Sequence, residues 1–119
     1  MSIKIPTRMS KTFVNVVRTL VSNAEPLFME ELWLFGSVAR GTANLTSDLD
    51  FLVLVDKPSI RKQSSLAVEL LDVREDASDV NVDVVVRTRE TMADMSQLFQ
   101  REVNRDKIII WTKERGYCV

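Results

Sequence analysis

Residues 34–55, which read LFGSVARGTANLTSDLDFLVLV, contain two apolar runs separated by a glycine-containing turn and two closely spaced aspartates. The first run, residues 31–35, is typical of a short strand that ends at Gly36. The second, residues 48–55, predicts a strand whose later part is buried on both faces. Between them, residues 37–41 predict a short helical turn.

The rest of the chain predicts further helices and strands in alternation. Apolar residues at helical spacing predict helices over residues 10–23, 59–73 and 90–103. Residues 80–86 and 107–112 are rich in valine or isoleucine and predict two more strands. Strands that alternate with helices indicate an α/β sandwich, here a small mixed sheet of about four strands with helices packed on it.

The apolar side chains outside the central segment are interpreted as packing. This applies to Trp33 and Trp111, and to the stripe of residues Met92, Met95, Leu98 and Phe99, which share one side of the helix predicted over residues 90–103. The strand near residues 108–111 is expected at a sheet edge, where it could pair with a second copy in a homo-oligomer.

The composition limits the kinds of function. A chain of 119 residues, 45% hydrophobic and 28% charged, is expected to form one domain over residues 1–119. Its 16 basic and 17 acidic residues give a formal charge of −1, which argues against nonspecific binding to nucleic acid. One cysteine excludes an intrachain disulfide, and the lack of a signal or membrane-length apolar segment predicts a cytoplasmic protein.

The chain contains no histidine. Mechanisms that need an imidazole base, and metal sites that need imidazole ligands, are therefore excluded. A cation held by carboxylates, phosphates and water would be a hard ion, which favours magnesium or manganese over zinc.

The polar residues of the turn and of the strand after it suit the binding of phosphate and metal. Gly36 lacks a Cβ, so a phosphate can approach the backbone, and Ser37 offers a hydroxyl at a turn with free amide groups. Arg40, about one helical turn beyond Ser37, can bring its guanidinium toward the same phosphates. Asp48 and Asp50 are two apart on a strand, so both carboxylates point to one face and can bracket a divalent metal.

Asp83 stands among valines on the next predicted strand and is the natural third carboxylate. Three acidic groups on neighbouring strands suit two metal ions about 3.5 to 4 Å apart, which stabilise both oxygens of an in-line phosphoryl displacement. Each feature alone is commonly turn or surface chemistry, but their combination predicts nucleotidyl transfer.

The chain resembles the minimal nucleotidyltransferases of the DNA polymerase β superfamily, through GSVARG at 36–41, SDLDF at 47–51 and VDVVV at 82–86. The resemblance covers nearly the whole chain and implies a polymerase β palm-like fold. The segment REDASD at 74–79 departs from the family pattern, in which a shorter basic or glycine-containing link is expected before the third aspartate.

The resemblance implies a role for each site residue. Gly36 and Ser37 would contact the nucleotide phosphates, Asp48 and Asp50 would bind the metals, and Asp83 would complete the site and help to activate the acceptor. Many small family members are antitoxins paired with a HEPN-type RNase toxin, and some attach AMP from ATP to a tyrosine of that toxin. The resemblance therefore implies two Mg²⁺ ions, ATP as substrate and a partner protein as acceptor.

Two alternatives remain open at this stage. The chain could be a non-catalytic antitoxin that neutralises its toxin by covering the active surface, although the presence of all three aspartates argues against an idle site. It could also adenylylate a small molecule such as an aminoglycoside, which in that family usually relies on an additional domain.

Overall fold

The computed structural model describes most of the chain, namely residues 5–24, 29–44, 47–56 and 80–118. The helix predicted over residues 59–73 and the segment 74–79 lie outside the described residues. Within the described part, the longest helix is α1 (Thr7–Ala24), which matches the prediction over residues 10–23. No described helix has the length and apolar character that crossing a membrane requires.

Five strands of the described residues form one mixed sheet in the order β3-β2-β1-β4-β5. Strand β1 pairs antiparallel with β2 and β4, whereas β2 and β3 are parallel neighbours. The strands are β1 (Met29–Phe35), β2 (Leu49–Val55), β3 (Val82–Thr88), β4 (Ile108–Thr112) and β5 (Gly116–Tyr117). The predicted α/β architecture is confirmed, and β5 is an addition to the four predicted strands.

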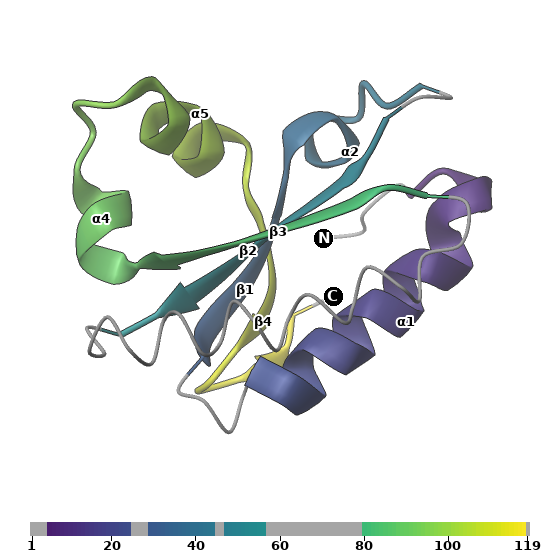
Figure 1. Cartoon of the computed structure of the whole chain (residues 1–119), viewed down its shortest axis with the longest axis horizontal. Helices are drawn as coiled ribbons and strands as arrows, with labels where there is room; N and C mark the ends of the chain where they lie inside the picture. Colours follow the sequence, from purple (N-terminus) through teal and green to yellow (C-terminus); the bar gives the residue numbers. More distant parts are fainter. Residues whose placement is uncertain (1–4, 25–28, 45–46, 57–79, 119) are drawn as a thin grey trace.

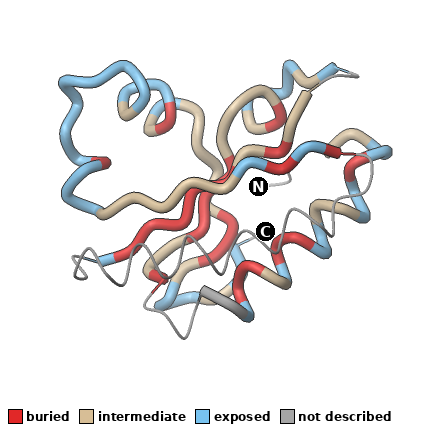
Figure 2. The backbone as a smooth tube through the Cα atoms, in the orientation of Figure 1, coloured by how far each residue is buried: buried red, intermediate tan, exposed pale blue. Residues whose placement is uncertain are grey.

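Helices lie on both faces of this sheet (Figure 1). The long helix α1 covers one face, whereas α4 (Arg89–Ala93) and α5 (Leu98–Asp106) lie on the other. The short helix α2 (Gly36–Arg40) follows β1 directly. The most deeply buried residues belong to the central strands and to the side of α1 that faces them (Figure 2).

The side chains of β2 divide between two apolar clusters, one on each face of the sheet. Phe51 and Val53 pack with the α1 side, and Leu52 and Leu54 pack with Met92 of α4 and its neighbours. Because side chains alternate along a strand, Asp50 lies on the same face as Leu52. Helix α1 therefore covers the face opposite to the one that carries this carboxylate.

The prediction of a single helix over residues 90–103 is wrong. The structure has two helices, α4 and α5, because the Asp94 carboxylate accepts a hydrogen bond from the Ser96 amide at 3.0 Å and offers the backbone an alternative to helix. Of the predicted stripe only Met92 is buried, whereas Met95, Leu98 and Phe99 are 49%, 61% and 36% exposed. Trp33 and Trp111 are buried, as predicted.

The expectation of a free edge along residues 108–111 is also wrong for the second half of β4. Trp111 pairs with Tyr117 of β5, and the Cys118 amide donates to the Ile110 carbonyl at 2.8 Å. A two-residue strand gives no periodic pattern in the sequence, so this cover could not be foreseen.

Candidate active site

Three aspartates converge at one end of the sheet. One carboxylate oxygen from each of Asp48, Asp50 and Asp83 lies within 4.8 Å of the others. Asp48 and Asp50 are partly buried, and Asp83 is exposed. Among the described residues, none of the three carboxylates takes part in a hydrogen bond or ion pair. Within the described residues the cluster is therefore a concentration of negative charge without an ion-pair partner, and its Asp83 side is exposed to solvent.

The parallel register of β2 and β3 produces this convergence. Asp50 and Asp83 are directly paired neighbours, and the Leu49 amide donates to the Asn81 carbonyl at 2.9 Å just before them. Both strands begin at this end of the sheet, where antiparallel β1 finishes and Phe35 pairs with Asp50. The sequence predicted that the three aspartates would come together, but it did not predict the parallel pairing that sets Asp50 beside Asp83.

The electrostatics of Asp50 reflect this crowding. Burial raises the pKa of Asp50 to about 6, with further upward contributions from the Asp83 and Asp48 carboxylates. The positive charge of Arg40 opposes this rise in the pKa of Asp50. A carboxylate whose negative charge is unfavourable in the folded protein attracts a cation more strongly than an isolated aspartate does.

Position 36 requires a glycine because the Asp50 carboxylate lies directly against it. Its φ is +79°, in the left-handed region that side chains disfavour, and an added Cβ would overlap the Oδ2 atom of Asp50. The space beside Gly36, which the sequence predicts to receive a phosphate, is filled in the structure by a protein carboxylate. The glycine therefore lets the chain turn tightly against the acidic cluster.

The other predicted nucleotide contacts, Ser37 and Arg40, both lie on α2. The Ser37 hydroxyl donates and accepts no hydrogen bond within the described part of the chain. The Arg40 guanidinium is 3.4 Å from the Oδ2 atom of Asp106, the last residue of α5. Helix α2 ends at Gly41, whose φ is +76°. The structure thus brings Gly36 against the carboxylates and ties Arg40 to a residue that sequence reasoning missed.

A second residue missed by sequence reasoning supports the loop before Asp48. Arg8 of α1 donates from its Nη2 atom to the Asn44 carbonyl at 2.9 Å and to the Ser47 carbonyl at 3.4 Å. The Ser47 hydroxyl also accepts from the Asn44 amide at 2.8 Å. Arg8 is about forty residues away in sequence, so no local pattern could have indicated this role.

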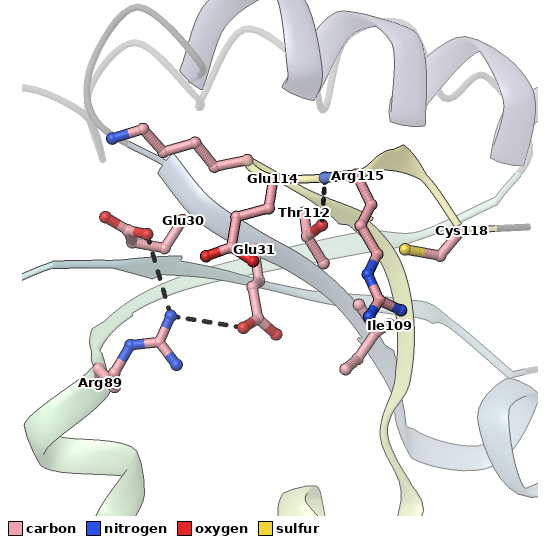
Figure 3. A pocket seen from close by; sticks show the side chains of 9 residues that line it. Glu30, Glu31, Arg89, Ile109, Thr112, Glu114, Arg115 and Cys118 are labelled. Carbon is pink, nitrogen blue, oxygen red and sulfur yellow. Dashed lines mark hydrogen bonds and ion pairs between the residues drawn. The ribbon is translucent and has the colours of Figure 1, made fainter.

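The opposite end of the sheet contains a cavity of about 700 Å³ lined mainly by charged side chains. Figure 3 shows Arg89 between Glu30 and Glu31, with distances of 3.9 and 3.4 Å between the paired atoms. The indole Nε1 of Trp33 also donates to Glu31 at 2.8 Å. Glu30 and Glu31 thus have ion-pair partners, whereas the three aspartates have none among the described residues.

The model of the family described as "Nucleotidyltransferase domain" matches residues 11–118, and the chain belongs to this family of nucleotidyl-transferring enzymes. Among curated proteins, no match was found.

Solved structures share the fold. A candidate nucleotidyltransferase from Sulfolobus solfataricus is 21% identical, with a TM-score of 0.54 over 92% of this chain and 95% of that chain. A chain from a toxin-antitoxin crystal structure with AMP-PNP is 26% identical, with a TM-score of 0.52 over 84% of this chain and 73% of that one. A MntA-HpeT toxin-antitoxin mutant with two aspartate-to-glutamate substitutions is 24% identical, with the same TM-score and coverage.

Proposed function

We propose that this protein is a magnesium-dependent nucleotidyltransferase that transfers AMP from ATP to a hydroxyl of a partner protein. We further propose that it acts as an antitoxin and that the partner is a HEPN-type RNase toxin. The observation that carries the proposal is the cluster of three carboxylates, which have no ion pair among the described residues and each bring one oxygen within 4.8 Å of the others beside the Gly36 turn.

The donor set of the cluster fits hard divalent cations. It consists of carboxylate oxygens, and the chain contains no histidine that could add a borderline nitrogen ligand. We assign Asp48, Asp50 and Asp83 as the residues that would hold two Mg²⁺ ions. Bound there, the ions would neutralise the triphosphate and stabilise the charge that develops during phosphoryl displacement.

The chain's own residues would bind ATP and orient it for in-line attack. The Gly36–Ser37 turn and the Arg40 guanidinium would contact the phosphates. The acceptor hydroxyl oxygen would form a bond to the α-phosphorus while the bond from that phosphorus to the oxygen bridging the β-phosphate breaks. Pyrophosphate leaves, and the hydroxyl proton passes to Asp83, the most exposed of the three carboxylates.

Two observations support a protein as the acceptor. The chain from the toxin-antitoxin structure with AMP-PNP is 26% identical to this one, which supports both an adenine nucleotide and a toxin partner. In addition, the carboxylates are partly or fully exposed, so a hydroxyl on the surface of another protein can reach them. Two cavities in the described part of the chain are lined by residues other than the three aspartates.

The test is an intact-mass measurement on a candidate HEPN-type toxin incubated with this protein, ATP and Mg²⁺. We expect the toxin to gain one or more AMP units and to lose RNase activity. The Asp48→Asn, Asp50→Asn double variant is the negative control, and Glu31→Gln is the matched carboxylate-to-amide control that should retain transfer. A toxin that is silenced by tight binding without any mass increase would overturn the transferase proposal in favour of a binding module.

A further inference from the structure

Arg40 stands between two acidic groups of different kinds. On one side its Nη1 atom is 3.4 Å from the Asp106 carboxylate, and on the other its own helix, α2, begins at Gly36, which lies directly against the Asp50 carboxylate of the aspartate cluster. Arg40 lies on α2 and Asp106 ends α5, so this contact connects segments separated by 66 positions in the sequence.

Asp106 is itself held in place. Its two carboxylate oxygens accept from the Nε and Nη2 atoms of Arg105 at 2.9 and 3.0 Å. Its side chain is 11% exposed, compared with 43% for Arg40. A two-point contact with one arginine fixes the orientation of a carboxylate, and the oriented Oδ2 atom then faces the second arginine.

A free arginine beside three unpaired aspartates would form an ion pair with them. Such a pair would place the guanidinium where a cation must bind and would remove it from the phosphates. An arginine that serves a triphosphate next to a metal site therefore needs an anchor outside the cluster. Within the described residues, Asp106 is the carboxylate that contacts Arg40.

We propose that Asp106 is a positioning residue, which holds the Arg40 guanidinium beside the aspartate cluster and keeps it available for the nucleotide phosphates. This inference rests on the proposed function of the site. It assigns to Asp106 a role that depends on Arg40, because the hydrogen-bond partners of the Asp106 carboxylate in the described part of the chain are the two arginines Arg40 and Arg105.

The experiment is a double-mutant cycle read by equilibrium binding of AMP-PNP in the presence of Mg²⁺, without any acceptor. We expect Asp106→Asn to weaken AMP-PNP binding by roughly threefold to tenfold and to raise the Mg²⁺ concentration needed for half-maximal binding. Asp106→Glu should recover most of the affinity, because the carboxylate is retained. In an Arg40→Gln background, Asp106→Asn should have no further effect, since the residue through which it acts is gone.

Three outcomes overturn the inference. Equal AMP-PNP affinities for the wild type and Asp106→Asn would show that the contact is a surface ion pair without a role in binding. A loss of affinity in Asp106→Asn that Asp106→Glu fails to recover would show that binding does not depend on the carboxylate at this position. A persistent effect of Asp106→Asn in the Arg40→Gln background would show that Asp106 acts by another route. If the wild type shows no Mg²⁺-dependent binding at all, the proposed function fails together with the inference.

Discussion

At the start of β1, two glutamates form ion pairs with an arginine, whereas at the other end of the same sheet three aspartates lie together with no ion pair among the described residues. Glu30 and Glu31 share Arg89, and Glu31 also accepts a hydrogen bond from Trp33. At the aspartate end, Arg40 is close enough to influence Asp50, but its ion pair is with Asp106.

Under the proposed function, the difference separates acidic residues that maintain the fold from acidic residues that bind a cation. A carboxylate with a cationic partner is neutralised within the protein and contributes modestly to stability. Carboxylates that crowd one another lower the stability of the folded chain unless a bound cation offsets their repulsion. Acidic residues at the two ends of one sheet thus differ in their proposed role, and the cationic partner of the glutamates is what distinguishes them.

The largest expected difference is between two single variants, each of which removes one negative charge from one end of the sheet. Asp48→Asn should lower AMP transfer by at least about a thousandfold, because a metal ligand and its charge are lost while the side-chain shape is kept. Glu31→Gln, the same chemical change, should leave transfer within about twofold, since its carbonyl can still accept from Trp33. Rates of toxin modification measured by mass spectrometry test both variants. Similar losses in the two variants would break the comparison.

The next effect concerns the glycine that touches the cluster. Gly36→Ala should destabilise the protein by about 2–4 kcal/mol and lower transfer by about a hundredfold, because the new Cβ would displace the Asp50 carboxylate. Gly41 has a similar φ of +76° but open space around it, so Gly41→Ala should cost about 1 kcal/mol and retain activity. Urea unfolding and transfer assays measure the two effects. If Gly41→Ala impairs transfer equally, backbone strain rather than contact with Asp50 explains the result.

A third prediction concerns the stability of the metal-free protein. The pKa of Asp50 is raised to about 6, so the folded protein holds this proton more tightly than the unfolded chain does. The stability contributed by protonated Asp50 is complete below about pH 4 and is lost as the pH rises through about 6. Without metal, Asp50→Asn should therefore stabilise the protein at about pH 7.5 by roughly 1–2 kcal/mol, after allowance for solvent screening, and much less at about pH 4.5.

Thermal unfolding with and without Mg²⁺ tests this third prediction further. Thermal unfolding should show a higher melting temperature for Asp50→Asn than for the wild type in a chelator at about pH 7.5. Added Mg²⁺ should raise the melting temperature of the wild type and change that of Asp50→Asn much less. A wild type that is the more stable of the two without metal would contradict the view that the cluster repels itself.

The carboxylate end could largely be foreseen from the sequence. The two-residue spacing of Asp48 and Asp50 within an apolar strand, and the position of Asp83 among valines, are local patterns that report which face each side chain occupies. Their meeting required a further fact, the parallel pairing of β2 with β3, which depends on how the whole chain is arranged. Local periodicity therefore identified the residues but not the register that brings them together.

Other features depend on partners that are distant in sequence or on single side chains. The helix over residues 90–103 has suitable apolar spacing, but one hydrogen bond from the Ser96 amide to Asp94 divides it. The partner of Arg40 is Asp106, 66 positions away, and no pattern around either residue indicates the other. Such contacts become visible only in the folded structure, because they arise from packing between elements.

The smallest expected effect lies at the glutamate end. Arg89→Gln removes the shared partner of Glu30 and Glu31, and we expect a loss of about 0.5–1 kcal/mol in the free energy of unfolding. Arg89 is 56% exposed, so salt screens the pairs and the difference from the wild type should shrink as ionic strength rises. Transfer and AMP-PNP binding should not change, because this end is remote from the carboxylates. Urea unfolding at low and high salt measures the effect, and a loss of transfer in Arg89→Gln with unchanged stability would place a functional role at the end of the sheet that we assign to structure alone.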